Sequence, residues 1–383
     1  MPITKRELNL LKNIASAPTA PFCEMVPLAR VKAWAEKNQI ECREDKFGNL
    51  LLKYPGTEKV RDPWVLQAHL DHPSFGVVKQ QGRTVHAQFR GSVLPKFFKG
   101  ESVRFFPELI GHPKPNKMQD LSDGSDKFAS VTGTILSAKL DKKTRFLNCR
   151  IKLDRLPEEP LQPGTLGMWN LPAWRQSGDK LSLRACDDLV GAAAVLTTIE
   201  RLKRTGAKRP VYGLLTRAEE LGFVGALAAA QLGTIKKSWP VLGIETSKAQ
   251  AAAPIGGGAV IRVGDKKAVF SPSLNMHLDE AAAKVTKRKG IQVVRSLMPG
   301  GSTESTLLAT VGYRTCATCI PLGNYHNMGK DKIRVEQVNL SDYASLISLL
   351  VVASQSTPND TPSKKFAEQI DAHCKAVIKA ASF

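Results

Sequence analysis

Two adjacent glutamates, Glu219 and Glu220, follow the apolar run PVYGLLT and precede an Ala-rich segment with the composition of a helix. The apolar run is typical of a buried strand, so both carboxylates fall at the end of that strand. Adjacent carboxylates repel each other, and placing them next to a hydrophobic core is costly. Another part of the chain should therefore offset this repulsion.

Other segments also place histidines and carboxylates where a strand is expected to end. These are VLQAHLD with His69 and Asp71, the segment before the helix at 191–203 with Asp187 and Asp188, VLGIE with Glu245, and CIPLGNYH with His326. The carboxyl ends of strands in an open α/β sheet gather at one edge, where ligands bind. One such residue alone has a simple structural explanation, for example as a helix cap. The whole set predicts a shared site.

A dinuclear metal centre accounts for the whole set. Imidazole and carboxylate are suitable ligands for zinc, and also for cobalt or manganese. One bridging carboxylate, with a histidine and a second carboxylate for each ion, makes two three-ligand sites with room for water. Two divalent ions about 3.5–4 Å apart can hold a hydroxide and polarise a carbonyl. Of Glu219 and Glu220, one then serves as a ligand and the other as general base, while Asp71 can orient the imidazole of His69.

The surrounding elements predict an α/β fold with an inserted β domain. Residues 1–75 are expected to form two helices and then two strands, GNLLLKYPG and WVLQAHLDH. Residues 76–175 contain short alternating runs with frequent Gly and Pro, which predict a small β domain. Strands and helices alternate again over 176–355, the pattern of a sheet covered on both faces. Residues 356–383 are expected to form a polar linker and a short helix.

The composition favours a cytoplasmic protein without a membrane segment. The chain has 383 residues, of which 42% are hydrophobic and 23% charged. Its N-terminus lacks the apolar core of a signal peptide, and its longest apolar run is too short to span a bilayer. Its seven cysteines, an odd number, suit buried thiols better than a disulfide framework.

The net charge of +20, from 55 basic and 35 acidic residues, is unusual. Such a charge can serve nucleic-acid binding or acidic substrates. However, the basic residues are dispersed, and the densest run, KVTKRKG, lies where a helix is expected to end. The sequence therefore does not favour a nucleic-acid partner.

The motifs AHLDHPSFG, CDDLVGAAA, TRAEELGFVGA, GIETS and GNYHNMG, in this order, resemble those of the co-catalytic dinuclear metallopeptidases. The chain is most similar to TET-type, glutamyl-aminopeptidase-like enzymes over about residues 5–350. The resemblance implies a zinc-peptidase-like α/β/α sandwich with an inserted PDZ-like or barrel domain. It also implies two divalent metal ions, most often zinc, short peptide substrates, and a homo-oligomer ranging from a dimer to a dodecamer.

The resemblance also assigns roles to individual residues. It makes His69 a ligand of one metal, Asp187 the bridging ligand and Glu219 the general base. Glu220 and His326 would complete one metal site, and Glu245 the other. The glycine-rich segments PIGGGAVI and PGGSTEST resemble loops that line the family's active site, which implies substrate-binding roles for Gly256, Gly257, Gly301 and Thr303.

Four positions in three of these motifs depart from the family's pattern. The family usually has Asp where this chain has Glu245, and Glu there is commoner in carboxypeptidase relatives. His72 and Pro73 replace the usual Glu and apolar residue after the first motif, and Leu189 replaces the usual Arg after the Asp pair. These departures bear on substrate preference and assembly, but no ligand type is lost.

Three functions follow from these observations. The first is a metal-dependent aminopeptidase that removes N-terminal residues from short peptides. The second is a related metal-dependent carboxypeptidase or amide deacylase, which Glu245 favours. The third is a catalytically silent scaffold or nucleic-acid-binding protein, which the net charge favours and the complete ligand set disfavours.

Overall fold

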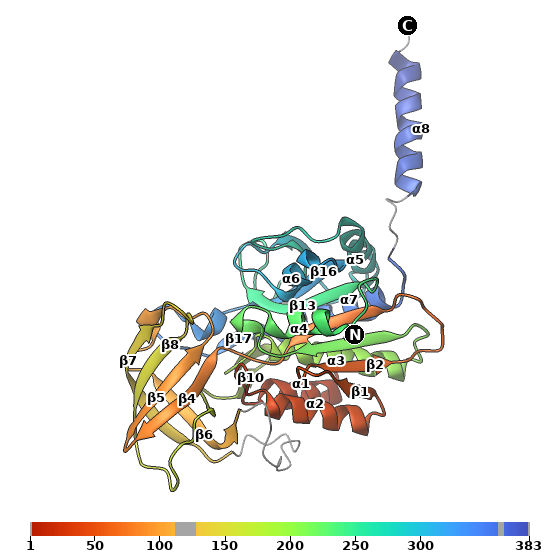
Figure 1. Cartoon of the computed structure of the whole chain (residues 1–383). Helices are drawn as coiled ribbons and strands as arrows, with labels where there is room; N and C mark the ends of the chain where they lie inside the picture. Colours follow the sequence, from red (N-terminus) through yellow and green to blue (C-terminus); the bar gives the residue numbers. More distant parts are fainter. Residues whose placement is uncertain (1, 112–127, 359–363, 382–383) are drawn as a thin grey trace.

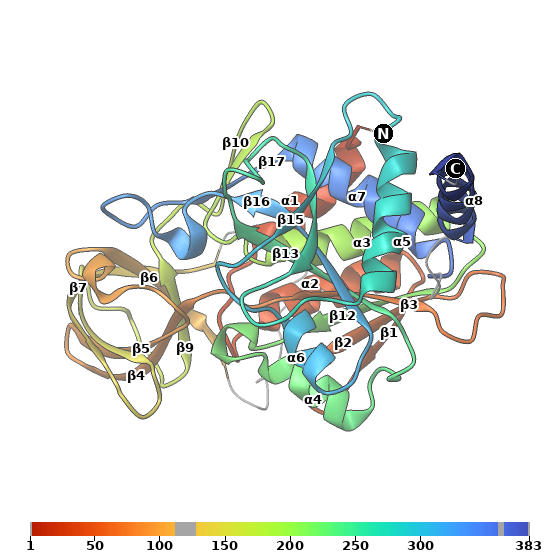
Figure 2. The ribbon, with the colours of Figure 1, turned by 90° about the horizontal axis from the view of Figure 1, so that it is seen from above.

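The computed structural model describes residues 2–111, 128–358 and 364–381. A central eight-stranded sheet carries helices on both faces, and a closed six-stranded barrel lies beside it (Figures 1 and 2). A separate three-stranded sheet completes the described strands. The α/β fold with a barrel in the inserted segment is the fold class that the sequence predicts.

The central sheet places the carboxyl ends of four strands at one edge. In spatial order its strands are β1 (Glu41–Glu44), β2 (Leu50–Tyr54), β12 (Val211–Thr216), β3 (Trp64–His69), β13 (Val241–Lys248), β16 (Thr315–Leu322), β14 (Ala259–Gly264) and β15 (Val293–Leu297). Strands β12, β3, β13 and β16 are neighbours and run parallel. Their side chains are almost all buried, as expected for strands with helices on both faces.

Two helical layers cover this sheet. The larger core unites one face with α1 (Lys5–Ala15), α2 (Met25–Lys37), α3 (Leu189–Arg204), α5 (Pro272–Val285) and α7 (Leu340–Ser354). The other face packs against α4 (Val224–Leu232) and α6 (Glu304–Thr310). Successive side chains of strand β3 point to opposite faces of the sheet: Leu66 joins the larger core, and Val65 joins the smaller one.

The barrel has its own hydrophobic core. Its strands are β4 (Ser74–Gln81), β5 (Thr84–Arg90), β6 (Ser102–Ile110), β7 (Val131–Leu140), β8 (Leu147–Leu153) and β9 (Thr165–Trp169), with η1 (Pro95–Phe97) between β5 and β6. Phe75, Phe89, Phe98 and Trp169 contact one another inside it. We propose that this barrel is the inserted domain, with 1–75 and 176–355 forming the discontinuous α/β domain.

The third sheet consists of β10 (Trp174–Ser177), β11 (Lys180–Leu183) and β17 (Glu336–Asn339). Strand β11 is the strand that precedes α3, and we expected it to belong to the central sheet. That expectation is wrong, because among the described strands β11 pairs only with β10 and β17. The segment after β11 nevertheless reaches the same edge of the central sheet, because it leads into α3.

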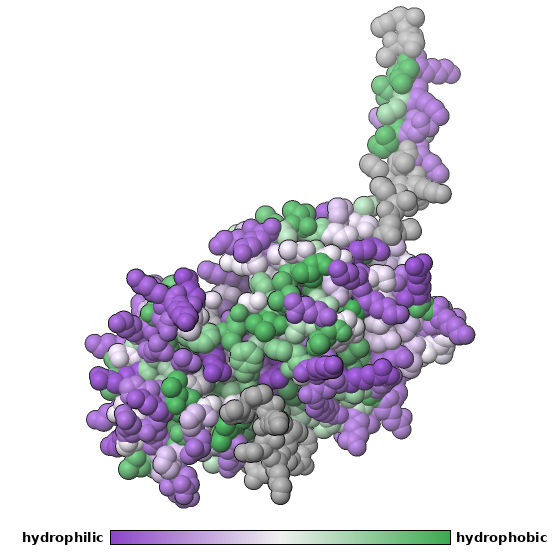
Figure 3. Space-filling view, in the orientation of Figure 1, coloured by the Kyte–Doolittle hydropathy of each residue, from purple (hydrophilic) through white to green (hydrophobic). Residues whose placement is uncertain are grey.

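The remaining elements are η2 (Glu219–Leu221), η3 (Tyr325–Asn327) and α8 (Lys364–Ala381), which projects away from the body in Figure 1. Among the described helices, none combines the length and the apolar character needed to cross a membrane. Figure 3 shows hydrophobic residues gathered over the middle of one face, with mainly hydrophilic residues around them.

Candidate metal centre and active-site cavity

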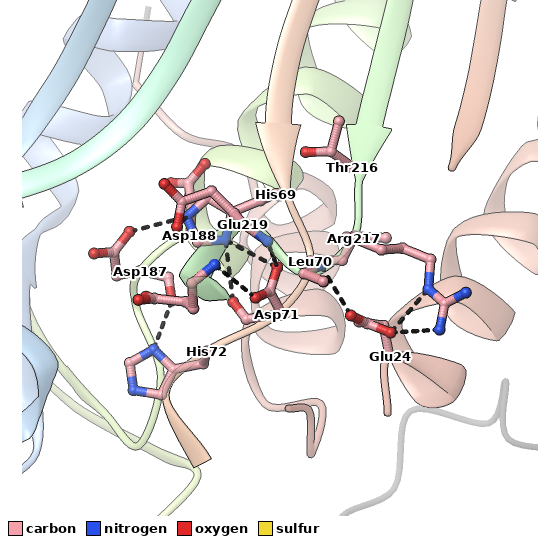
Figure 4. A network of polar contacts seen from close by, with 12 residues as sticks. Glu24, His69, Leu70, Asp71, His72, Asp187, Asp188, Thr216, Arg217 and Glu219 are labelled. Atoms are coloured by element: carbon pink, nitrogen blue, oxygen red, sulfur yellow. Dashed lines mark hydrogen bonds and ion pairs between the residues drawn. The ribbon is translucent and has the colours of Figure 1, made fainter. Parts of the chain in front are cut away.

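The edge formed by the four parallel strands collects the residues that the sequence analysis singled out. His69 is the last residue of β3, and Glu219 and Glu220 form η2 directly after β12. Glu245 lies inside β13, three residues before its end, and His326 lies in η3 after β16. Figure 4 shows His69, at the end of β3, close to Glu219, in the turn after the neighbouring strand β12.

Asp187 lies between the two histidines. Its Oδ1 is 3.4 Å from Nε2 of His69, and its Oδ2 is 3.5 Å from Nε2 of His326. The carboxylate therefore presents one oxygen to each imidazole. This is the arrangement that a carboxylate bridging two ions requires.

The potential ligand atoms fall into overlapping groups of three. His69, Asp187 and Glu245 form one group, and Asp187, Glu220 and His326 form another, with the ligand atoms of each group within 4.8 Å of one another. A third group joins His69 with Glu219 and Glu220. The first two groups share only Asp187 and match the two three-ligand sites predicted from the sequence. The ligand roles themselves remain predictions.

Each histidine has its Nδ1 atom occupied by a carbonyl oxygen. Nδ1 of His69 lies 3.2 Å from the backbone oxygen of Asp71, and Nδ1 of His326 lies 2.9 Å from that of Ser92. A carbonyl oxygen can only accept, so each Nδ1 carries the proton. The lone pair of a neutral ring is then on Nε2, the atom that faces Asp187 in both cases.

Two buried carboxylates hold the loop that carries Glu219 and Glu220 in place. The carboxylate of Asp71 accepts the backbone N–H groups of Glu219 (2.9 Å) and Glu220 (3.1 Å). The side chain of Asp71 thus holds the turn, and its backbone oxygen holds the imidazole of His69. Glu24, which is fully buried, accepts the N–H of Ala218 at 3.0 Å and pairs with Arg217 at 2.8 Å (Figure 4).

A further buried carboxylate, Glu336 on β17, connects two ligand-bearing segments. Its Oε2 accepts the N–H groups of Cys186 (2.6 Å) and Asp187 (3.1 Å). Its Oε1 accepts the N–H of His326 at 2.8 Å. Glu336 therefore sets the relative position of Asp187 and His326, and no motif in the sequence singled it out.

Burial and mutual repulsion make the site electrostatically unfavourable for its own carboxylates. Burial raises the pKa of Glu245 to about 8 and that of Glu219 well above its usual range. For Asp187, burial acts in the same direction, but the adjacent imidazoles of His326 and His69 lower its pKa below the ordinary value. For both histidines, burial is outweighed by the surrounding carboxylates, so that their pKa values are raised. The site therefore favours bound positive charge.

The donor set fits divalent metal ions. Oδ1 of Asp187 and Oε1 of Glu220 are buried and have no hydrogen-bond partner, although Oε1 of Glu220 lies 3.1 Å from Nε2 of His326. Ligand atoms about 2.0–2.1 Å from a tetrahedral zinc ion lie roughly 3.3 Å from one another. The oxygen and nitrogen atoms of these side chains thus lie at the spacing expected of ligands that share an ion, although they do not form hydrogen bonds with one another.

A cavity of about 320 Å³ opens directly above these residues. Its lining includes Asp187, Glu219, Glu220, Glu245 and His326, together with Gly301 and Thr303 from the loop before α6. Gly256 and Gly257 do not line it, and the N–H of Gly256 is instead bound by Asp342 of α7 at 2.7 Å. The second glycine-rich segment therefore faces the cavity, and the first packs against α7.

His72, which replaces the family's usual Glu, points away from this cavity. Its Nδ1 lies 2.6 Å from the backbone oxygen of Asp187 and its Nε2 lies 3.0 Å from Oδ1 of Asn327. Both ring nitrogens are occupied by protein acceptors. His72 therefore supports the segments that carry Asp187 and His326.

Comparisons with known proteins relate the chain to a peptidase family. The profile of the M42 glutamyl aminopeptidase family matches residues 142–349, which contain every predicted ligand except His69. Among curated proteins, none matches the chain.

Several solved structures share the fold. A TET aminopeptidase from a marine sediment archaeon of the Thaumarchaeota has 20% identity and a TM-score of 0.72, covering 92% of this chain and 97% of that one. An aminopeptidase from Desulfurococcus kamchatkensis has 18% identity and a TM-score of 0.71, covering 92% and 96%. The TET1 peptidase of Pyrococcus horikoshii has 18% identity and a TM-score of 0.69, covering 91% and 99%.

At these identities the structural likeness shows a common fold, and the family profile supplies the relationship in sequence. The profile spans more than half of the chain, from the barrel to α7. The TET-type resemblance of the motifs is therefore confirmed: the chain belongs to the M42 glutamyl aminopeptidase family and is a metal-dependent aminopeptidase.

Proposed function

We propose that this enzyme binds two divalent metal ions and removes single residues from the N-terminus of short peptides. The observation that carries the proposal is the position of Asp187, whose two oxygens face the two histidines of separate ligand groups. His69 and Glu245 would hold one ion, and Glu220 and His326 the other. Zinc suits this nitrogen and oxygen set, and cobalt or manganese could replace it.

When bound, the ions would acidify water and polarise the scissile carbonyl. Glu219 is the residue proposed to handle the proton. It lines the cavity beside the ligands, and burial raises its pKa well above the usual range, which suits a group that accepts and returns a proton. Glu219 would take the proton of the attacking water and pass it to the leaving amine. Asp71 fixes its position through the N–H of Glu219.

We further propose that the enzyme is a cytoplasmic homo-oligomer. The TET1 peptidase of Pyrococcus horikoshii assembles into a tetrahedron or a large octahedral shell. Hydrophobic residues gathered on one face are typical of a protein interface, and Figure 3 shows such a face here. All seven cysteines are free thiols, which suits a reducing compartment.

The first test measures metal and activity on one purified sample. Metal per chain is quantified, and the protein is then assayed with added zinc, cobalt or manganese on peptides with free and with acetylated N-termini. We expect about two ions per chain and cleavage of free N-termini only. Cleavage restricted to acetylated peptides would instead establish the deacylase or carboxypeptidase alternative that Glu245 favours. No bound metal and no turnover would refute the proposal.

A further inference from the structure

Tyr325 is a residue of the cavity wall that the proposed mechanism does not use. It directly precedes the candidate ligand His326 in η3, and it lines the active-site cavity. Its ring is partly buried against the larger core. Among the described residues, none forms a hydrogen bond with its hydroxyl group, and this oxygen is not enclosed by protein. The cavity wall therefore offers a phenol O–H that is free to bind a ligand.

The ring of Tyr325 lies face to face with the imidazole of His326. The ring centroids are 3.7 Å apart, and the ring planes differ by 24°. Because the two rings leave adjacent Cα atoms and stack, they point in the same direction. Nε2 of His326 lies 3.1 Å from Oε1 of Glu220 and 3.5 Å from Oδ2 of Asp187. A tyrosine is longer than a histidine, so the phenol hydroxyl extends past the imidazole toward the candidate metal centre.

This stacking depends on an uncommon backbone. Successive side chains along a regular helix or strand point in different directions, so neighbouring rings do not normally stack. Here Asn324 (φ 55°), His326 (φ 53°) and Asn327 (φ 63°) all have the left-handed conformation, which is uncommon for residues other than glycine. Glu336 accepts the N–H of His326 at 2.8 Å and so helps to hold the turn. Backbone strain of this kind gathers at functional sites, and here it presents Tyr325 and His326 together.

Two other donors in the cavity wall are already bonded to the protein. Nε2 of Gln250 donates to Oγ of Ser296 at 2.9 Å. The backbone N–H of Thr303 donates to Oδ2 of Asp265 at 3.0 Å, and its hydroxyl lies 3.4 Å from the same oxygen. Tyr325 differs from both, because its hydroxyl is uncommitted and its ring lies against a candidate ligand.

We propose that Tyr325 is a catalytic residue whose hydroxyl donates a hydrogen bond to the oxyanion of the tetrahedral intermediate. The inference rests on the proposed peptidase function of the same cavity. In the addition step, Glu219 takes a proton from water, the water oxygen bonds to the carbonyl carbon, and the π electron pair of the carbonyl moves onto its oxygen. The O–H of Tyr325 donates to this oxygen and keeps its own proton.

The intermediate then collapses without a change at Tyr325. The oxyanion re-forms the carbonyl, the C–N bond breaks, and its electron pair goes to the nitrogen, which takes the proton held by Glu219. A carboxylic acid and a free amine result. The hydrogen bond from Tyr325 is strongest while the oxygen is charged. Its loss should therefore lower kcat and leave KM nearly unchanged.

Tyr325→Phe tests this role, because it removes the hydroxyl and keeps the ring that stacks on His326. On the peptide that wild type cleaves fastest, we expect kcat to fall about 10- to 100-fold, with KM within about threefold of wild type. Metal content per chain and the thermal unfolding midpoint should match those of wild type. Tyr212→Phe is the matched control, since Tyr212 lies at the opposite end of β12 from Glu219 and its hydroxyl has no partner in the described part of the chain.

Calorimetry with two substrate analogues gives a result that does not depend on turnover. A phosphinate dipeptide carries a tetrahedral, negatively charged group in place of the scissile amide. A reduced-amide dipeptide has a methylene group there and no oxygen. We expect Tyr325→Phe to weaken binding of the phosphinate about 10- to 100-fold and binding of the reduced amide less than about threefold.

Three outcomes would overturn the inference. An unchanged kcat with unchanged phosphinate affinity would show that the hydroxyl contacts no developing charge. A rise in KM alone would make Tyr325 a contact of the bound substrate, and a loss of metal would make it a support for His326. If wild type cleaves peptides in any of these cases, the peptidase function stands. If wild type cleaves no peptide but binds the phosphinate through the Tyr325 hydroxyl, the peptidase function fails and the donor role of Tyr325 stands.

Discussion

Replacing Glu336 by glutamine tests whether this residue positions two of the metal ligands. Its carboxylate accepts three backbone N–H groups, from Cys186 (2.6 Å), Asp187 (3.1 Å) and His326 (2.8 Å). A glutamine has one acceptor oxygen, and its NH₂ group must face an N–H donor on the other side. In one orientation His326 loses its partner, and in the other Cys186 and Asp187 both do.

The expected cost follows from these contacts. A hydrogen bond to a charged group contributes about 1.5–3 kcal/mol, and the variant loses at least one of them. Part of this loss should appear as lower stability, and part as misplacement of Asp187 relative to His326. Loss of a residue that orients metal ligands typically costs about 10- to 100-fold in metal affinity. We expect Glu336→Gln to fall in this range.

The assay separates these two effects. Metal affinity is measured by chelator competition at fixed pH, and unfolding free energy by denaturant titration of the metal-free protein. Asp331→Asn, an exposed carboxylate in the same segment, is the matched control. Metal affinity within twofold of wild type, in a variant that is destabilised, would refute the positioning role and leave Glu336 as a purely structural residue.

Three further predictions concern the same site. Glu219→Gln should lower kcat about 10²- to 10⁴-fold while metal content is retained. As a control, Glu280→Gln at an exposed position should leave kcat unchanged. Full activity of the Glu219 variant would disprove the base assignment. Burial raises the pKa of Glu245 to about 8, so its proton must leave when metal binds. Calorimetry in buffers of different ionisation enthalpy should therefore show proton release, and the metal affinity should rise from pH 6 to about 8. A metal affinity independent of pH over that range would contradict this prediction. Glu24→Gln leaves Arg217 without its buried partner and should reduce the unfolding free energy by about 3 kcal/mol, and a denaturant midpoint equal to that of wild type would show that the pair contributes little.

Part of the site could be predicted because it depends on a local rule. His69 ends a strongly apolar strand, and Glu219 and His326 each follow one; parallel strands bring their carboxyl ends to one edge. The residue types and their place after each strand were therefore sufficient to predict that they meet. The same rule located Glu245, although the strand continues three residues beyond it.

Glu336, which the sequence did not reveal, has no local signal. It lies in the segment VEQVN, which has the pattern of an ordinary strand. Its role depends on the segments of Cys186, Asp187 and His326, which donate to its carboxylate only in the folded chain.

The sequence by itself determined the chemistry available to this protein, because imidazoles and carboxylates at strand ends predict a metal site wherever the strands run parallel. The tertiary structure decided which atoms face each other. The barrel supplies the Ser92 carbonyl that orients His326, 234 residues further along the chain, and the three-stranded sheet brings Glu336 to Asp187, 149 residues away. Such contacts arise only when distant segments pack together, because a hydrogen bond depends on the final position of both partners and leaves no periodic pattern in either segment.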